Sequence, residues 1–470
     1  MAGPERRFVA RSELPVDRET AFAWHDRPGA LPRLSPPFLP AEVAEPGRGL
    51  AEGSRVVLRL PVGPLRGRLA PRWVAEHTRY DPPREFVDVQ RSGPFARFAH
   101  RHRFEDLGPG RSALVDDIAY RVPLGRLGEA VAGRTVRRTL AAMFAYRHRV
   151  TREDLAAHAA KEVDPMHVVV TGASGLIGRA LSAFLTTGGH TVTRLVRREP
   201  SGPDEARWDP AAGTVDREAL ARADAVIHLA GEGIAERRWS DAQKRRIRDS
   251  RVDGTRTIAQ ALAALGDDAP RTLVCASAVG YYGDRGDAEL DEASDPGEGF
   301  LADVVRDWEA AADPAREAGI RTAHVRIGIV QDPAGGALGK VLPLFRLGLG
   351  GRLGSGRQWW SWVSRDDVVG ILHHALTTPE VEGPINATAP EPVTNAEWTR
   401  VLGHVLGRPT VLPVPALGPK VLLGGELAQE LLFTSARVRP RRAEETGYVF
   451  RHPDLEGALR FLLGRDQAPS

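Results

Sequence analysis

Two patterns of apolar and polar positions divide the chain. Up to about residue 150, short runs alternate apolar and polar residues, as at 54–60, 85–90, 95–104 and 112–120. From residue 166, unbroken apolar runs alternate with segments of helical spacing. Alternation predicts antiparallel strands with one buried face, whereas apolar runs between helices predict parallel strands buried on both faces.

The first part, 1–150, ends in a predicted long helix. Val136, Leu140, Met143 and Phe144 recur at helical spacing and form one apolar stripe. Strands closed by a C-terminal helix predict an α+β helix-grip fold. Residues 151–165 are polar and alanine-rich, and we interpret them as a linker between halves that fold independently.

The interior of such a fold allows two interpretations. It either holds an open pocket for a hydrophobic ligand or is filled by side chains. His100 and His102 lie two residues apart on one strand face, but the sequence places no further ligands beside them. We therefore expect solvated histidines and no metal site.

The run at 167–171 leads into Thr171-Gly-Ala-Ser-Gly-Leu-Ile-Gly178 and an amphipathic segment. This order predicts a strand, a glycine turn and a helix. Gly172 permits the turn, Gly175 lets a pyrophosphate approach the backbone, and Gly178 lets helix and strand pack closely. The pattern predicts a dinucleotide site, and the alternative is a tight turn in an α/β domain without a ligand.

Arginines follow the second strand at the position that distinguishes the two nicotinamide nucleotides. A site for NAD(H) usually has an acidic residue about 20 residues past the glycines, where this chain has Arg197 and Arg198. Two guanidinium groups suit a 2′-phosphate. We therefore expect NADP(H) rather than NAD(H), the alternative being a solvated basic loop.

Further strands at 223–231, 271–277 and 322–328 alternate with helical segments, one at about 241–265. This alternation predicts an α/β Rossmann domain with a doubly wound parallel sheet over 166–415. The remaining residues, 416–470, carry more loops and are expected to complete a substrate lobe.

Composition adds limits. A length of 470 residues predicts several domains, and a net charge of +3 gives no reason to expect a nucleic-acid partner. The single cysteine, Cys275, lies in an apolar run, so we expect a core residue in a reducing, cytoplasmic protein. No run is long and apolar enough for a membrane span, and the first seven residues lack the apolar core of a signal peptide.

The second half is similar to atypical extended short-chain dehydrogenases/reductases of the NAD-dependent epimerase/dehydratase superfamily. It resembles most closely their YfcH-like subgroup, with a DUF1731 part at about 416–463. The similarity rests on the glycine motif and on the following stretches: His228-Leu-Ala-Gly-Glu-Gly-Ile-Ala235, Asp249-Ser-Arg-Val-Asp-Gly-Thr255, Ser277-Ala-Val-Gly-Tyr-Tyr-Gly283, Trp308-Glu309 and Arg326-Ile-Gly-Ile-Val330. The first half, from Leu14-Pro-Val-Asp onward, resembles the START-like (SRPBCC, polyketide cyclase/dehydrase) superfamily.

The resemblance implies NADP(H) bound along the edge of the parallel sheet, with Arg197 at the 2′-phosphate. The residues that it assigns to the nucleotide are Gly172, Ser174, Gly175, Leu176, Ile177, Gly178, Leu229, Ala230, Gly231 and Ala276. Ser277 would lie under the nicotinamide.

The catalytic pair of the superfamily is missing from this chain. Its Tyr-x-x-x-Lys motif supplies a proton from a tyrosine beside a lysine, but none of the four lysines here follows a tyrosine at that spacing. Phe300 and Val304 take the two positions. The remaining candidates for a catalytic role are Ser277, Tyr281 and Tyr282, tuned by Arg285 or Glu309, although the tyrosines could instead pack over the cofactor.

Two functions therefore stay open. One is an NADP(H)-dependent oxidoreductase or epimerase acting on an unknown small molecule, with the START-like half binding an apolar ligand. The other is a catalytically degenerate NADP(H)-binding sensor or regulatory protein. A homodimer is expected only by analogy with relatives of the fold.

Overall fold

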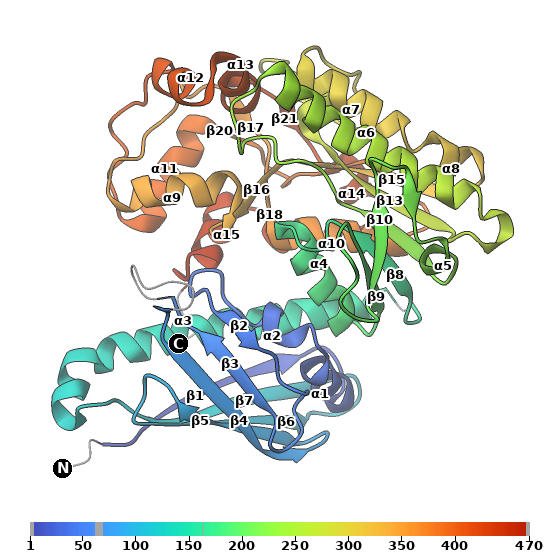
Figure 1. Ribbon diagram of the computed structural model, residues 1–470. Helices are drawn as coiled ribbons and strands as arrows, with labels where there is room; N and C mark the ends of the chain where they lie inside the picture. The colour runs from blue at the N-terminus through green and yellow to red at the C-terminus, as the bar shows by residue number, and fades with distance from the viewer. Residues whose placement is uncertain (1–3, 62–68, 162, 467–470) are drawn as a thin grey trace. The chain divides into compact units, whose positions relative to one another are not determined.

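The computed structural model describes residues 4–61, 69–161 and 163–466 (Figure 1). The first three residues, on which the expected absence of a signal peptide partly rests, lie outside this description. The chain forms two compact units, one made mainly by residues 4–161 and the other mainly by residues 163–460. Each unit has its own sheet, and within the described ranges no helix is long and apolar enough to cross a membrane.

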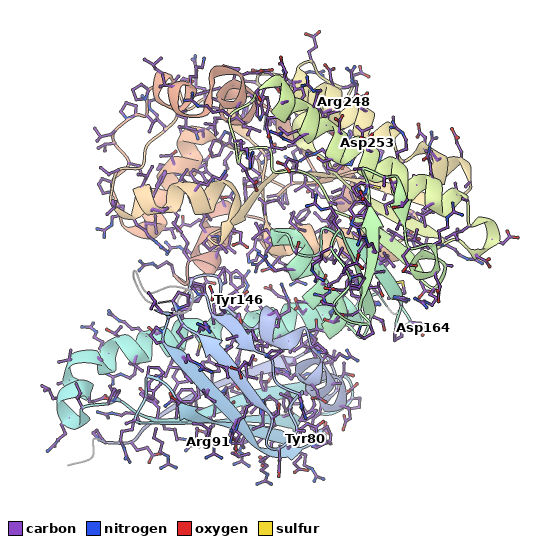
Figure 2. The ribbon with its side chains drawn as sticks, in the orientation of Figure 1. Tyr80, Arg91, Tyr146, Asp164, Arg248 and Asp253 are labelled. Carbon is purple, nitrogen blue, oxygen red and sulfur yellow. The ribbon has the colours of Figure 1, made fainter. Side chains whose placement is uncertain are left out.

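The described residues of the first unit form a seven-stranded antiparallel sheet with three α-helices, and the strand order is β1-β7-β6-β5-β4-β3-β2. Tyr80 and Arg91 lie on two of its central strands (Figure 2). The elements are β1 (Arg6–Leu14), α1 (Arg18–Asp26), α2 (Ala30–Arg33), β2 (Glu42–Glu45), β3 (Arg55–Arg59), β4 (Arg72–Asp81), β5 (Glu85–Ser92), β6 (Arg97–Asp106), β7 (Ser112–Arg121) and α3 (Gly125–Ala159).

The predicted stripe on α3 packs against the sheet. Leu140 and Phe144 share one core cluster with Phe98, Ile118 and Tyr120 of β6 and β7, which is the helix-grip arrangement. Helix α3 continues to Ala159, through most of the segment expected as a linker. The buried face of the helix continues into this segment, where Val150 and Leu155 belong to the core. β4 has no regular alternation of apolar and polar residues, and the pattern does not predict it.

The expectation of solvated histidines in this unit is wrong. His100 and His102 are only 4% and 8% exposed. They lie on the face of β6 that is turned toward α3, where the His100 ring contacts Phe144 with centroids 5.2 Å apart. The alternation of β6 buries them because their neighbours on the same face, Phe98 and Phe104, belong to the core.

The second unit is built on an eight-stranded sheet in the order β11-β10-β9-β8-β12-β13-β15-β19. All neighbouring strands are parallel except β10 and β11. The strands are β8 (His167–Thr171), β9 (Thr191–Val196), β10 (Glu205–Asp209), β11 (Thr214–Val215), β12 (Ala225–His228), β13 (Thr272–Ala278), β15 (Arg321–Ile327) and β19 (Gly383–Ala387). The strand order reverses direction between β8 and β12, which is where doubly wound folds bind their ligands.

Helices connect these strands and cover the sheet, and Figure 1 shows α6, α7 and α8 together on one side of it. The core on this side includes Ile258 and Leu262 of α6 packed with Val226 and Leu273 of the sheet. The helices are α4 (Leu176–Thr187), α5 (Arg217–Ala221), α6 (Asp241–Ala263), η2 (Gly266–Asp268), η3 (Val279–Tyr282), α7 (Phe300–Ala310), α8 (Asp313–Glu317) and α10 (Arg365–Thr377).

The rest of the unit is a set of short elements outside the large sheet. It includes three two-stranded sheets, β14–β21, β16–β18 and β17–β20. Its elements are β14 (Glu289–Leu290), β16 (Ile329–Asp332), α9 (Gly336–Arg346), β17 (Trp359–Trp360), β18 (Trp362–Ser364), β20 (Val393–Thr394), α11 (Asn395–Leu406), α12 (Leu417–Leu423), α13 (Gly425–Ala428), η4 (Gln429–Phe433), β21 (Arg437–Val438), α14 (Arg441–Glu445) and α15 (Leu455–Leu462).

Candidate functional site

The glycine loop joins β8 to α4 at the reversal point, and its shape excludes side chains at two positions. Gly172 has a φ of +65°, and a Cβ there would lie 2.8 Å from the carbonyl carbon and oxygen of Leu229. A Cβ on Gly178 would lie 2.2 Å from the Gly172 oxygen. Gly175 is exposed, and α4 begins directly after it. The loop therefore presents bare backbone at a helix N-terminus, the arrangement that receives phosphate groups.

The hydroxyl of Thr171 ties the end of β8 to the end of β12. Its Oγ1 lies 2.8 Å from Nδ1 of His228 and accepts from the amides of Leu229 (3.0 Å) and Ala230 (3.2 Å). These contacts hold the segment that begins at Leu229 beside Gly172. The predicted nucleotide-lining residues of the two strands thus share one edge of the sheet.

His228 gives this junction a pH dependence. It is fully buried, and burial lowers its pKa from 6.5 to about 4. Between these values the unfolded chain binds a proton that the folded chain does not, so stability is lost as the pH falls. The free energy of unfolding should fall between pH 7 and pH 4.5 in both chains, but by about 2 kcal/mol less in His228→Gln than in the parent. Urea unfolding at the two pH values measures this difference. Equal losses in the two chains would contradict this assignment.

The two arginines after β9 differ in their surroundings. Arg198 donates to the carboxylate of Glu205 at 2.6 Å and to the backbone oxygen of Glu199 at 2.8 Å. Arg197 is exposed and makes no hydrogen bond or ion pair with the residues that the structure describes. Arg197 is therefore the guanidinium available to an added anion, whereas Arg198 is already engaged.

At the end of β13 a chain of polar contacts starts from Ser277. Its Oγ donates to Glu309 of α7 at 2.6 Å, and Glu309 receives two hydrogen bonds of 2.8 Å from Arg326 of β15. A further Arg326 nitrogen donates to the hydroxyl of Tyr282 at 3.1 Å, which in turn donates to Asn386 at 2.8 Å. The five residues form one network across β13, β15 and β19.

Ionisation in this network follows from burial and pairing. Burial alone would raise the pKa of Glu309, but the hydrogen bonds and charge of Arg326 hold it below its ordinary value. Burial raises the pKa of Tyr282 to about 12. Glu309 is therefore a fixed anion, and Tyr282, fully buried with both hydroxyl contacts made, is a structural member of the network.

Tyr281 differs from Tyr282 although the two are adjacent in η3. It is half-buried, and no hydrogen bond joins its hydroxyl to another residue of the described ranges. Its ring lies over the Arg326 guanidinium, with 3.5 Å from the ring centroid to Cζ. Tyr281 is therefore the predicted candidate whose hydroxyl is free to meet another molecule, next to a fixed positive charge.

Helix α7 supplies neither a tyrosine nor a lysine where the superfamily has its pair. Phe300 packs on Trp239, with ring centroids 5.0 Å apart, and Val304 is buried. Arg285 donates to the backbone of Asp295 and takes no part in the network. Cys275 is in the core, as predicted, and burial raises its pKa to about 12.

The network includes one residue whose role sequence reasoning missed. Arg326 stands in one of the stretches that carry the family resemblance but is not predicted as a site residue, and it contacts Glu309, Tyr281 and Tyr282. The available signal was an arginine within a predicted parallel strand, since a buried arginine requires a carboxylate partner. The position of Ser277 beside Glu309 depends on the packing of α7, which no local pattern reveals.

Comparison with known families supports this description of the chain. Residues 168–387 match the NAD dependent epimerase/dehydratase family, and residues 414–462 match DUF1731, a domain of unknown function. Residues 14–144 match the family described as polyketide cyclase / dehydrase and lipid transport. The predicted resemblances and the predicted pair of folds are confirmed.

Individual relatives cover either the second half or nearly the whole chain. Epimerase family protein Mb2239 of Mycobacterium bovis is 45% identical over 298 residues, which are 63% of this chain and 98% of that protein. The solved structure of human epimerase family protein SDR39U1 with NADPH is 37% identical, with a TM-score of 0.58, covering 63% of this chain and 99% of that one. A structure described as a nucleoside-diphosphate sugar epimerase from Corynebacterium glutamicum is 35% identical with a TM-score of 0.81, covering 98% and 91%.

Proposed function

The chain belongs to the NAD dependent epimerase/dehydratase family, and from that premise we propose that its second unit is an NADP(H)-dependent oxidoreductase or epimerase. The observation that carries this proposal is the guanidinium of Arg197, which lacks a partner among the described residues at the end of β9. The engagement of Arg198 by Glu205 makes Arg197 the residue for a 2′-phosphate.

The residues present fit such a nucleotide. The loop has no room for a Cβ at Gly172 or Gly178, so its backbone lies where phosphates would approach it. A human relative has been solved with NADPH, which supports the choice of nucleotide. The residues that would hold it are those of the loop, namely Gly172, Ser174, Gly175, Leu176, Ile177 and Gly178, together with Arg197, Leu229, Ala230, Gly231 and Ala276.

The chemistry follows from the network at the end of β13. A bound nicotinamide supplies or accepts a hydride at the substrate carbon. In this proposal the Tyr281 hydroxyl, which makes no hydrogen bond within the described ranges, gives a proton to the substrate oxygen or takes one from it. Ser277 is buried with its hydroxyl proton held by Glu309, so its part is to position the end of β13. The Arg326 guanidinium, paired with Glu309, packs on the Tyr281 ring. Because a hydride and a proton move together, the substrate is a carbonyl compound or the corresponding alcohol.

A second candidate function is a nucleotide-binding sensor without turnover. The observation that favours it is the start of α7, where Phe300 and Val304 leave the usual positions of the proton relay without polar groups. Both functions require the Arg197 site. They differ in whether Tyr281 takes part in chemistry.

Arg197→Ala is expected to weaken NADPH binding by about 10–100-fold, because it removes charge-assisted hydrogen bonds to a phosphate. NADH lacks that phosphate, so its affinity should change by less than about twofold. The measurement is a fluorescence titration of each nucleotide with the full chain.

Arg198→Ala is the matched control, since its guanidinium is held by Glu205 and should contribute less to NADPH affinity. If Arg197→Ala weakens the binding of NADPH and NADH equally, or weakens the binding of neither, the assignment of the 2′-phosphate to Arg197 is contradicted.

A further inference from the structure

A second polar site lies inside the first unit. Asp88 of β5 lies opposite His100 of β6, and His102 of β6 lies opposite Asp116 of β7. Neighbouring positions in register and positions two apart on one strand share a face of the sheet. The four side chains therefore meet on the buried face, where charged groups require compensation.

Asp116 fixes the orientation of both imidazole rings. One of its oxygens lies 2.8 Å from Nε2 of His100 and 2.7 Å from Nδ1 of His102, and the other lies 2.6 Å from Nε2 of His148 on α3. Asp116 itself is only 2% exposed. A buried carboxylate that holds the far nitrogen of a histidine is the usual outer support of a metal-binding imidazole.

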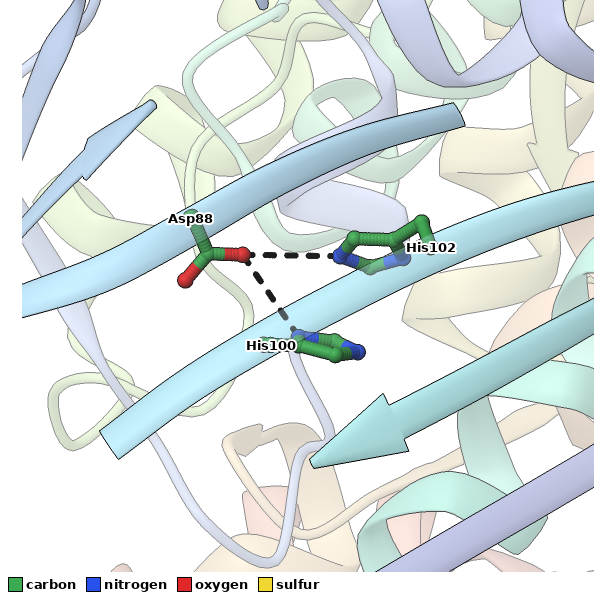
Figure 3. A group of neighbouring side chains, drawn as sticks. All are labelled: Asp88, His100 and His102. Atoms are coloured by element: carbon green, nitrogen blue, oxygen red, sulfur yellow. Dashed lines mark ion pairs between the residues drawn. The ribbon is translucent and has the colours of Figure 1, made fainter. Parts of the chain in front are cut away.

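The opposite nitrogens of the two rings converge on Asp88 (Figure 3). Nδ1 of His100 and Nε2 of His102 each lie 3.5 Å from the same oxygen of Asp88. Bonds of about 2.1 Å to a tetrahedral zinc ion place its ligand atoms about 3.4 Å apart. The three residues each offer a ligand atom, and these atoms all lie within 4.8 Å of one another. The spacing is long for hydrogen bonds and suits a shared ion.

Charge also favours a cation at this position. Within the described ranges, neither Asp88 nor Asp116 forms an ion pair with an arginine or lysine; the only ion-pair partners of both are histidines. Arg147 of α3 supplies a positive charge that acts on both carboxylates without pairing with either. The rest of their neutralisation, in an interior lined by Phe86 and Phe144, comes from protonated imidazoles or from a metal. A divalent ion neutralises both carboxylates while leaving the imidazoles uncharged, as ligation requires.

We propose that the first unit binds one divalent transition-metal ion of the Zn²⁺ type through Asp88, His100 and His102. Asp116 is the positioning residue that orients both rings. Three protein ligands leave a coordination position for water or another donor, as in zinc sites that are not purely structural. The Asp88 side chain is 16% exposed, which leaves the site a route to solvent.

The test uses the tag-free full chain, stripped with a chelator and titrated with Zn²⁺ by calorimetry. We expect about one ion per chain. Asp88→Asn, which keeps the shape of the side chain, should abolish this binding. Asp116→Asn should weaken it by about 10–100-fold, the usual effect of losing an outer support. His404→Ala, at a histidine with 62% side-chain exposure, should bind as the parent does.

X-ray absorption of the zinc-loaded parent chain gives a second readout that does not depend on a variant folding. It should show two imidazole ligands and oxygen donors. Absence of stoichiometric Zn²⁺ binding, a spectrum without two imidazoles, or full binding by a folded Asp88→Asn chain would each overturn the proposal and leave a buried histidine–aspartate ion-pair network.

Discussion

Replacing Tyr281 by phenylalanine is expected to reduce NADPH-dependent turnover by about 100–10,000-fold, the range for loss of a general acid. The hydroxyl has no partner among the described residues, so its removal should leave folding and nucleotide affinity unchanged. The measurement is NADPH oxidation with the best substrate from a panel of carbonyl compounds.

Tyr282→Phe is the matched control for this experiment. Its hydroxyl is buried between Arg326 and Asn386, so the variant should lose about 1–3 kcal/mol of stability. It should keep a turnover much closer to that of the parent. Unchanged turnover in Tyr281→Phe would exclude this tyrosine as the acid, and a panel without any substrate would favour the sensor.

The largest effect on stability is expected for Arg326→Met. The substitution leaves the Glu309 carboxylate, with a side chain only 14% exposed, without its cation. Breaking a buried ion pair on one side costs about 3–5 kcal/mol. We expect the melting transition of the second unit, identified as the one that NADPH raises, to fall by roughly 6–20 °C.

Two further chains isolate the cause of that loss. Arg248→Met, at an exposed arginine labelled in Figure 2, breaks surface pairs with Asp249 and Asp307 and should change stability by less than about 1 kcal/mol. The double variant Glu309→Gln with Arg326→Met removes the orphaned charge and should recover part of the stability. A single Arg326→Met chain as stable as Arg248→Met would contradict the role of the pair.

The sequence predicts those parts of the fold that local rules control. Strands β8, β9 and β12 are short runs rich in apolar and β-branched residues, and the glycine loop has a spacing that only a tight strand-to-helix turn explains. The sequence does not predict β4 because its apolar and polar residues do not alternate regularly. It is a strand because it pairs with β3 and β5. The end of α3 was missed because an alanine-rich segment reads as a linker until Leu155 is seen to be buried.

The residues of the candidate site likewise fall into those that the sequence predicts and those that only the tertiary structure reveals. Gly172 belongs to the glycine turn between β8 and α4, and Arg197 lies at a fixed number of residues after that turn. Both positions can therefore be found by counting along the sequence. Glu309 reaches Ser277 only because α7 packs against β13. The difference between Tyr281 and Tyr282 is likewise a tertiary one, since burial and partners alone distinguish two adjacent tyrosines.

His100 shows the same limit in the first unit. The alternation of residues along β6 does not show which face of the strand is covered by α3. The partners of His100, Asp88 and Asp116, lie on two other strands. A search along the sequence for closely spaced ligands therefore could not find them.

The most direct test of the central claim is a titration of the purified full chain with NADPH and with NADH, followed by nucleotide fluorescence. We expect saturable binding of both nucleotides at one site, with NADPH bound at least about tenfold more tightly because only NADPH carries the phosphate that Arg197 meets. Equal affinities, or no binding of either nucleotide, would contradict it.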